Sequence, residues 1–511
     1  MRITQSLHNA VQQAPERTST VCGTRRRTVA ETFDRVSRLA GALQGLGVTP
    51  GDRVGVYAMN SDRYYELYFA VPWAGGVINP VNTRWSAIEV AYSLVDCQTE
   101  VLVVDDTFAP SVPALREAFP GLRAVIFSGE GETPEGMLNF ETLVAEAEPV
   151  ADVERGGDDL FGIFYTGGTT GEPKGVMLSH QACLTSAMGC LVTTDVFTRG
   201  GVTLHAAPMF HLADVASFNI GNLTGAVHVF VPGFTPDGVA AAIQEHLVTD
   251  ALLVPTMIQL LVDDPGVGDY DLSSVARILY GASPISEALL ERARAALPNA
   301  GFAQAYGMTE LAPVATLMTE EDHQDPTLAR SCGRPAAHAE VRIVSPDDVE
   351  LPRGEVGEIV VRGDHVMAGY WNKPEQTAEA LRGGWMHTGD AGRMDDRGYV
   401  FVVDRIKDMI ITGGENVYSV EVENAVAKHP AVQQAAVVGL PDDQWGERVH
   451  AFVVAKPGQS LTLEELQEFC RPLIAGYKLP RGLELIPAFP VSGAGKVLKR
   501  ELRLTAATPA S

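Results

Sequence analysis

The sequence of 511 residues lacks any apolar run near the roughly 18 residues that a membrane-spanning helix needs. It is also poor in cysteine: its 6 cysteines are scattered without the paired spacing of a metal site, which predicts reduced thiols. Basic residues are few, with 39 Lys and Arg against 64 Asp and Glu and a formal net charge of −25. Nucleic acid and anionic lipid both need clustered Lys and Arg, so neither partner is expected, and stable membrane insertion is not expected either.

The first five residues, Met1 to Gln5, lack the charged and then apolar pattern of a secretory signal, which favours a cytoplasmic protein. Hydrophobic residues make up 46% of the chain. A chain of this length and composition can bury a large core and form more than one domain.

Up to about residue 340, compact apolar runs alternate with helical stretches, which predicts an α/β fold of parallel sheets covered by helices. The apolar runs lie at residues 53–57, 101–105, 124–127, 227–231, 251–254 and 277–280. Ser283 and Pro284, a capping hydroxyl followed by proline, predict the start of a helix that runs from Ile285 to Leu297.

The pattern changes beyond about residue 340, where short strands separated by Asp, Pro and Gly turns predict a small antiparallel barrel or sheet. A polar connector at 404–408 predicts a hinge, and the residues after it predict a small α+β unit. We therefore expect an N-terminal domain at 1–403, which includes a β-barrel-like subdomain at about 340–403, and a mobile C-terminal domain at 409–511.

A segment rich in glycine and threonine, from Tyr165 to His180, follows a predicted buried strand. Glycines let the backbone turn its N–H groups toward an anion, threonine hydroxyls add donors, and a lysine adds a mobile charge. This chemistry predicts a polyphosphate site made of Thr166, Gly167, Gly168, Thr169, Thr170, Gly171 and Lys174. The Walker A spacing is absent, because Glu172 and Pro173 separate Gly171 from Lys174.

The same segment closely resembles the signature of the adenylate-forming superfamily, which includes acyl-CoA synthetases, luciferases and the adenylation domains of peptide synthetases. Gly167 stands where that family usually has serine, so one hydroxyl contact to phosphate is missing. The resemblance implies a large N-terminal domain, a mobile C-terminal domain, and ATP as a substrate with Mg²⁺.

Two further segments of the first domain fit that resemblance. In the family, the tyrosine of the motif Ala305 to Glu310 lies against adenine, the threonine contacts phosphate, and the glutamate binds Mg²⁺, which suits the residue types of Tyr306, Thr309 and Glu310. The same resemblance implies that three residues upstream border the adenine, namely Gly281, Ala282 and Ser283.

Motifs nearer the C-terminus complete the pattern. Asp390 and Arg405 resemble the residues that hold the ribose hydroxyls, and Lys496 resembles the lysine that bridges the acyl carboxylate and the α-phosphate. After rotation about a hinge at Lys407, Gly413 and Gly414 would admit the pantetheine arm of coenzyme A. Ser419 stands where proline is frequent in the family, a departure without an explanation in the sequence.

The acid pocket is expected around the segment 208–213, where His211 resembles the family's gate residue beside the carboxylate. A core or helix-capping histidine is the alternative. Small residues in the following helix, Gly221 among them, permit a long or bulky acyl group. No dedicated aspartate for a substrate amine stands at the start of this helix, although Asp214 is nearby, so amino acids are disfavoured.

The expected activity is that of an ATP-dependent carboxylic acid–CoA ligase that forms AMP and acts on a medium- or long-chain fatty acid. Three alternatives stay open: an aryl or arylpropenoic acid–CoA ligase, an acyl-AMP ligase that loads a carrier protein, and a catalytically silent adenylate-binding protein. Homodimers are frequent in the family.

Overall fold

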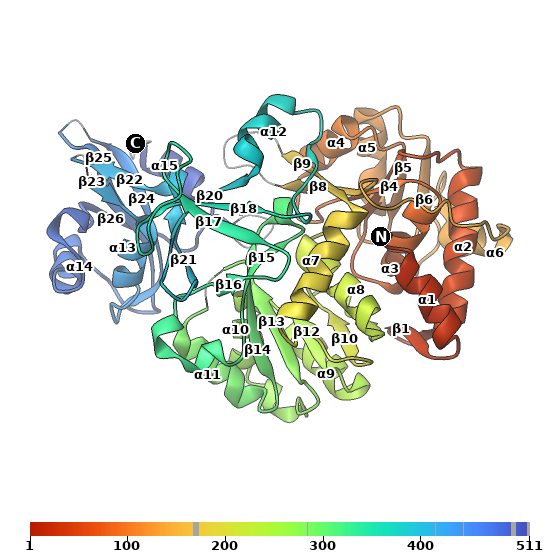
Figure 1. Ribbon diagram of the computed structural model, residues 1–511, viewed down its shortest axis with the longest axis horizontal. Helices are drawn as coiled ribbons and strands as arrows, with labels where there is room; N and C mark the ends of the chain where they lie inside the picture. Colours follow the sequence, from red (N-terminus) through yellow and green to blue (C-terminus); the bar gives the residue numbers. More distant parts are fainter. Residues whose placement is uncertain (167–172, 284, 414, 443, 492–496, 508–511) are drawn as a thin grey trace. The chain divides into compact units, whose positions relative to one another are not determined.

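The computed structural model describes residues 1–166, 173–283, 285–413, 415–442, 444–491 and 497–507 (Figure 1). The chain divides into two compact units, one of the described residues in 1–341 and 361–386 and one of those in 342–360 and 387–507. The hinge at 404–408 stays a prediction. Among the helices that the model describes, none is long and apolar enough to cross a membrane.

The first unit contains two large sheets, each with a run of parallel strands and antiparallel strands at an edge. The nine-stranded sheet has the order β16 (Arg334–Pro335), β15 (Val314–Met318), β14 (Gly301–Gly307), β13 (Arg277–Gly281), β12 (Asp250–Leu252), β10 (Val202–His205), β11 (Val227–Phe230), β1 (Thr18–Cys22) and β2 (Arg25–Thr28). The eight-stranded sheet has the order β19 (Gly369–Tyr370), β9 (Lys174–Ser179), β8 (Leu160–Thr166), β4 (Val77–Pro80), β3 (Arg53–Tyr57), β5 (Val101–Val104), β6 (Ala124–Phe127) and β7 (Leu138–Asn139). The α/β fold predicted from the alternating pattern is confirmed.

Helices connect and cover these strands (Figure 1). The α-helices of the first unit are α1 (Gln5–Gln13), α2 (Val29–Gly45), α3 (Asp62–Trp73), α4 (Ala87–Asp96), α5 (Val112–Ala118), α6 (Phe140–Glu146), α7 (His180–Thr193), α8 (Leu212–Thr224), α9 (Pro236–His246), α10 (Pro255–Asp263), α11 (Glu287–Ala296) and α12 (Pro374–Ala380). Side chains alternate along each strand, so Ile278 and Tyr280 pack with α9, α10 and α11, whereas Leu279 packs with α7 and α8.

Helix α3 joins the two sheets of the first unit. It connects β3 to β4 in the eight-stranded sheet, and every one of its residues is buried. Its Tyr65 and Phe69 rings lie 5.2 and 4.9 Å from the ring of Phe218 in α8, which connects strands of the nine-stranded sheet. A helix that is buried on all sides in this way fixes both sheets to each other.

The predicted start of one helix is wrong. Helix α11 begins at Glu287, and its capping residue is Ser286, whose hydroxyl accepts the N–H of Leu289. Ser283 instead belongs to the turn that follows β13, and Pro284 lies outside the described residues. Ser283 and Ser286 both have a hydroxyl that can cap a helix N-terminus. In the fold, the helix begins after Ser286.

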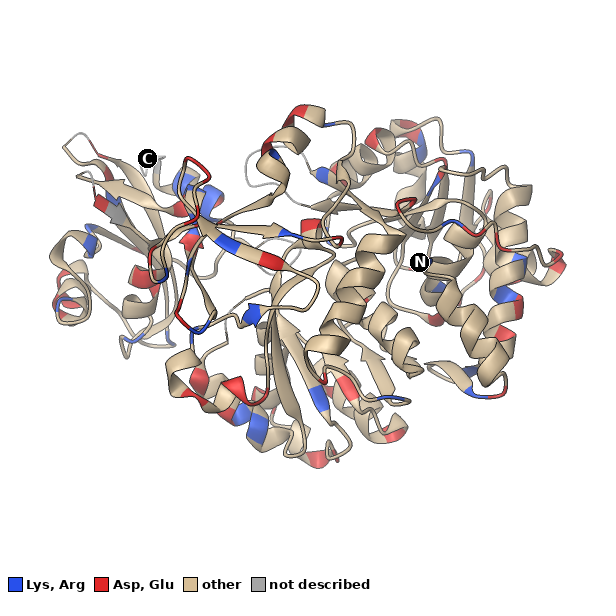
Figure 2. Cartoon of the chain, viewed as in Figure 1, with Lys and Arg blue, Asp and Glu red and all other residues tan. Residues whose placement is uncertain are grey.

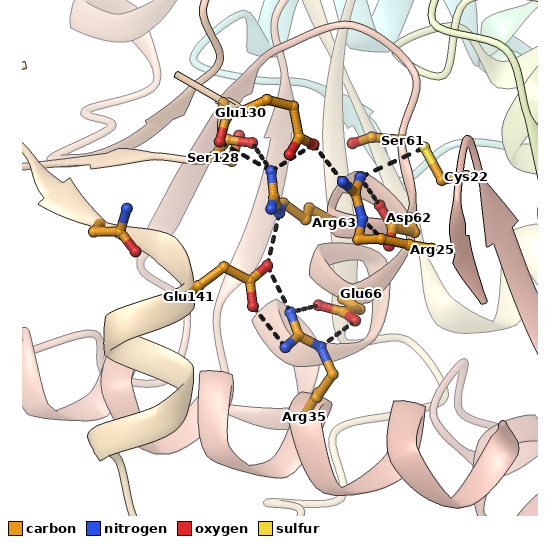
Figure 3. Close-up of polar contacts among 12 residues, drawn as sticks. Cys22, Arg25, Arg35, Ser61, Asp62, Arg63, Glu66, Ser128, Glu130 and Glu141 are labelled. Atoms are coloured by element: carbon orange, nitrogen blue, oxygen red, sulfur yellow. Dashed lines mark hydrogen bonds and ion pairs between the residues drawn. The ribbon is translucent and has the colours of Figure 1, made fainter. Parts of the chain in front are cut away.

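Charged residues lie mostly on helices and loops, and the strands of the large sheets consist mostly of uncharged residues (Figure 2). One partly buried ionic network departs from this pattern, because four arginines from β2, α2 and α3 meet carboxylates of α3, α6 and the loop after β6. Its members are Arg25, Arg27, Arg35, Arg63, Asp62, Glu66, Glu130 and Glu141. Figure 3 labels all of its members except Arg27. Burial raises the pKa of Glu141, but hydrogen bonds and charge from Arg35 and Arg63 outweigh it and lower that pKa to about 2. The four arginines are matched by four carboxylates, so we interpret this network as a structural feature.

The second unit contains a complete five-stranded sheet and most of a four-stranded sheet. The four-stranded sheet has the order β17 (Glu340–Val344), β18 (Gly357–Arg362), β20 (Met386–Met394) and β21 (Val400–Arg405); the five-stranded sheet has the order β23 (Glu415–Val417), β22 (Ile410–Thr412), β25 (Gly446–Ala455) and β24 (Val432–Asp442), with β26 (Gly482–Leu485) beside β25. Helices α13 (Ser419–Val426) and α14 (Leu463–Cys470) pack on one face of the five-stranded sheet, and α15 (Lys499–Ala507) packs on the other.

Candidate active site

The carboxyl ends of parallel strands in the nine-stranded sheet bring several predicted residues together. Strand β13 leads into Gly281, Ala282 and Ser283, and its neighbour β14 contains Tyr306. Gly281 pairs with Ala305, so the turn after β13 lies beside Tyr306. A Cβ atom on Gly281 would lie only 2.4 Å from the carbonyl oxygen of Ala305, so this close approach requires glycine. Such an edge is the usual ligand-binding edge of an open α/β sheet.

Glu310 lies one turn beyond β14, in the short 3-10 helix Thr309–Leu311, and is buried. The hydroxyl of Tyr370 donates a hydrogen bond of 2.8 Å to Oε1 of Glu310. The ammonium of Lys174 lies 4.8 Å from the centre of the Tyr370 ring. The predicted phosphate-binding lysine and the predicted magnesium ligand therefore contact the same tyrosine.

Tyr370 acts in this arrangement as a neutral donor. Burial, reinforced by the neighbouring carboxylate of Glu310, raises the pKa of its hydroxyl well above the ordinary value, so the proton stays on the tyrosine. Strand β19 places the ring by pairing Tyr370 with Val176 of β9. Tyr370 was not among the residues predicted from the sequence; its signal there is an aromatic pair, Tyr370 and Trp371, directly after Gly369.

The phosphate-binding segment starts from the antiparallel pair β8 and β9. Thr166 at the end of β8 is paired with Lys174 at the start of β9, which places both residues beside each other. The loop residues predicted between them, Gly167, Gly168, Thr169, Thr170 and Gly171, lie outside the described part of the chain.

The start of the segment predicted to border the acid pocket, residues 208–213, is held by α3 and by the loop before it. The side chain of Asn60 donates to the carbonyl of Ala207 at 2.8 Å and accepts the N–H of Met209 at 2.8 Å, and Tyr68 donates to the carbonyl of Met209. His211 precedes the first residue of α8, but its side chain makes no capping hydrogen bond. Its ring centre lies 4.2 Å from that of Phe210.

The carboxylate of Asp214 is buried and contacts a histidine of the protein. Its Oδ2 lies 2.8 Å from Nδ1 of His205, whose Nε2 lies 2.8 Å from Nδ1 of His228, and all three side chains are buried. Burial and the neighbouring His205 hold the pKa of His228 well below its usual value, so this ring is neutral. The engaged carboxylate of Asp214 is unsuited to recognising a substrate amine.

The small size of Gly221 has an explanation inside the protein. A Cβ atom there would lie 2.7 Å from the His228 ring, so glycine makes room for this buried histidine. From the sequence, this small residue was expected to leave room for the acyl group. The room that it leaves for His228 is a structural reason for glycine, and its part in an acyl pocket stays a prediction.

In the second unit, Asp390 and Arg405 face each other across β20 and β21. They are paired in register, and Nε of Arg405 lies 2.7 Å from Oδ1 of Asp390. Arg405 also donates to the carbonyl of Thr388 at 3.4 Å, and the hydroxyl of Thr388 donates to the carbonyl of Ile359 at 2.7 Å. The strand pairing thus brings together the two residues predicted to hold a ribose.

Gly413 lies at the tip of the hairpin formed by β22 and β23, with φ at +60°. Its N–H donates to the carbonyl of Trp445 at 2.8 Å, and a Cβ atom would lie 2.8 Å from the Trp445 ring. Both observations require glycine at this position. Gly414 and Lys496 lie outside the described residues.

The predicted residues therefore divide between the units. Those of the first unit are Thr166, Lys174, His211, Gly281, Ala282, Ser283, Tyr306, Thr309 and Glu310, and those of the second are Asp390, Arg405 and Gly413. Within the described residues, no group of three or more His, Cys, Asp and Glu side chains could hold a metal ion by itself.

Known proteins resemble the chain over nearly its whole length. Residues 7–371 match the family model described as AMP-binding enzyme, and residues 421–496 match that of the AMP-binding enzyme C-terminal domain. A feruloyl-CoA synthase from an Amycolatopsis species is 40% identical, with 93% of each chain covered. The fatty acid–[acyl-carrier-protein] ligase ScoC of Streptomyces coeruleorubidus is 37% identical, with 98% of this chain and 95% of the relative covered. The structure of ATP-bound MatB from Rhodopseudomonas palustris is similar with a TM-score of 0.88 at 29% identity, with 99% of each chain covered.

Proposed function

The chain belongs to the AMP-binding enzyme family and is an AMP-forming acid–thiol ligase, and on that premise we propose that it joins an apolar carboxylic acid to coenzyme A. A carboxylate oxygen attacks the α-phosphorus of ATP, and pyrophosphate leaves. The thiol of coenzyme A then attacks the carbonyl carbon of the acyl-adenylate, and AMP leaves with the oxygen that joined it to the acyl group. Catalysis of such a step is mainly positioning and charge stabilisation.

The observation that carries this proposal is the linked set Lys174, Tyr370 and Glu310. The set combines a cation for phosphate with a carboxylate held in place by a neutral donor, as a bound Mg·ATP requires. A single protein carboxylate suits Mg²⁺, which takes its other ligands from water and phosphate. When bound, the ion would neutralise phosphate charge. Glu310 would hold it, and Lys174 would contact the phosphates.

The remaining residues complete the proposed mechanism. Asp390 would accept hydrogen bonds from the ribose hydroxyls while Arg405 keeps its carboxylate oriented. Gly281, Ala282, Ser283 and Tyr306 would enclose the adenine, Thr309 would contact phosphate, and His211 would border the acid. Residues 167–171 would surround the phosphates, Lys496 would stabilise charge during adenylation, and Gly413 with Gly414 would admit coenzyme A after the C-terminal domain, residues 409–511, turns about Lys407.

We propose a medium- or long-chain fatty acid as the substrate class, with an arylpropenoic acid as the second candidate. The likeness to a feruloyl-CoA synthase favours the second candidate, and the likeness to a fatty acid–carrier ligase favours the first. The pairing of Asp214 with His205 argues against α-amino acids for either candidate.

A panel of carboxylic acids tests the proposal. Purified protein with Mg·ATP and each acid is assayed for AMP and pyrophosphate, with coenzyme A, with a phosphopantetheinyl carrier protein, or with neither acceptor. We expect acid-dependent turnover with coenzyme A and a preference for decanoate to palmitate over ferulate and over amino acids. Turnover with the carrier protein alone would contradict the proposed acceptor, and a preference for ferulate would select the second substrate class.

A further inference from the structure

Asp404 joins the end of β21 to the first turn of α13, and we propose that it is a positioning residue that couples the ribose-binding pair to the C-terminal domain. One of its carboxylate oxygens accepts the N–H of Arg405 at 2.7 Å. The other accepts the N–H of Ser419 and, at 3.4 Å, that of Val420. Asp404 is buried.

The contact is an N-terminal cap supplied from another element. Tyr418 occupies the capping position of α13 but makes no side-chain capping bond. A helix N-terminus has unpaired N–H groups and a partial positive charge, so a buried carboxylate there stabilises the helix. Because the same carboxylate also holds the backbone of Arg405, the placement of α13 and of the Arg405–Asp390 pair depends on one side chain.

Ser419 has two contacts that the family's usual proline could not make. Proline lacks the N–H that Asp404 accepts, and it has no hydroxyl. The Ser419 hydroxyl lies 2.5 Å from Nζ of Lys499, which also lies 2.7 Å from Oε1 of Glu423. Lys499 is the first residue of α15, so Ser419 ties the first turn of α13 to the helix that follows the proposed catalytic segment.

The bonds from Asp404 to Ser419 and Val420 cross the proposed pivot. Asp404 precedes Lys407, whereas Ser419, Val420 and Lys499 follow it. Arg503 of α15 contacts Asp408 at 2.8 Å, but both residues lie beyond Lys407, so rotation about the pivot would leave that contact intact. Rotation about Lys407 would instead separate Asp404 from α13. The Asp404 cap therefore stabilises one orientation of the C-terminal domain and is released in the other.

The inference rests on the proposed two-step function, and a set of matched variants tests it. Asp404→Ala removes the cap. Ser419→Pro removes the N–H and the hydroxyl but keeps a residue that helix starts favour, whereas Ser419→Ala removes only the hydroxyl. Asp395→Ala, at a turn between β20 and β21, serves as the control for loss of a carboxylate in the same hairpin.

Each variant is assayed in two single-turnover reactions: acid-dependent pyrophosphate release, and thioester formation from supplied acyl-AMP and coenzyme A. We expect Asp404→Ala and Ser419→Pro to change the ratio of the two rate constants by on the order of tenfold, in the same direction. Ser419→Ala should change it less, and Asp395→Ala should leave it unchanged. Hydrogen exchange should show lost protection at residues 419–420 in Asp404→Ala, while the rest of α13 stays protected.

Equal slowing of both reactions, or opposite changes of the ratio in Asp404→Ala and Ser419→Pro, would overturn the inference. So would unchanged protection at residues 419–420. Failure of the proposed function gives a different result, because the unaltered protein would then release no pyrophosphate in response to an acid.

Discussion

Nε of Arg405 lies 2.7 Å from Oδ1 of Asp390 across the paired strands β20 and β21. The guanidinium contacts this carboxylate and fixes the direction of the group, and a carboxylate held in this way suits the two hydroxyls of a diol. The two residues come from separate motifs of the sequence, and the strand register alone makes them neighbours.

If Asp390 and Arg405 hold the ribose, the enzyme should distinguish ATP from 2′-deoxy-ATP. The unaltered protein should use ATP better by on the order of tenfold to a hundredfold in kcat/KM, because the deoxy analogue leaves a hydrogen-bonding group of the site without a partner. Asp390→Asn should reduce this preference to about threefold or less, whereas Asp395→Asn should preserve it. Steady-state kinetics with both nucleotides measures the ratio, and an unchanged preference in Asp390→Asn would remove Asp390 from the ribose site.

Tyr370→Phe should slow adenylate formation by about tenfold to a hundredfold, since it removes the donor to Glu310 but keeps the ring beside Lys174. The variant should also need more Mg²⁺ for half-maximal rate. Tyr65→Phe, which removes a buried hydroxyl that donates to Asn222, is the matched control. A normal Mg²⁺ requirement in Tyr370→Phe would show that the hydroxyl does not position a metal ligand.

Lys496→Ala should lower the rate of adenylate formation by on the order of 10²–10³ and leave thioester formation from supplied acyl-AMP nearly unchanged. The reason is that the lysine stabilises charge in the first step only. Lys456→Ala, at an exposed lysine, controls for general effects of charge removal. The assignment fails if the two half-reactions lose rate equally.

Acid should destabilise the fold through buried histidines. Burial lowers the pKa of His180 to about 4 in the folded protein, while the ordinary value is 6.5. Above pH 6.5 the ring is neutral in both states; as the pH falls from about 6.5 toward 4, only the unfolded chain gains the proton, so stability is lost. The cost for His180 is of order 3 kcal/mol at its largest.

Urea unfolding between pH 7 and pH 4.5 measures this effect. His180→Asn should weaken the pH dependence, although it also alters the bond that His180 accepts from the N–H of Ile3 at 3.1 Å. The pH slope rather than the absolute stability is therefore the readout. An identical slope in the variant would contradict the assignment.

Local patterns predicted much of the fold. The strands at 53–57 and 124–127 have their predicted limits, and Thr462 and Glu465, three residues apart, form a capping box. Each of these features depends on side chains a few residues apart, so the sequence contains the whole signal. The predicted start of α11 was wrong because Ser283 and Ser286 both have a hydroxyl that can cap a helix.

Contacts between distant segments could not be predicted in this way. Tyr370 meets Glu310, Asp214 meets His205, and Asp404 caps α13 only because strands and helices bring them together. The order of the motifs predicts which residues belong to the site, and this assignment stays a prediction, whereas the partners that hold these residues are found only from the packing. The unexplained Ser419 is an example, since its contacts with Asp404 and Lys499 become visible only in the fold.

In the proposed first step, a carboxylate oxygen of the substrate attacks the α-phosphorus of ATP. The most direct measurement uses an acid labelled with ¹⁸O in both carboxylate oxygens, with ATP, Mg²⁺ and coenzyme A, and mass analysis of the AMP and pyrophosphate. Attack by the carboxylate would place one ¹⁸O atom in AMP and none in pyrophosphate. Unlabelled AMP, or label in a product phosphate other than AMP, would contradict it.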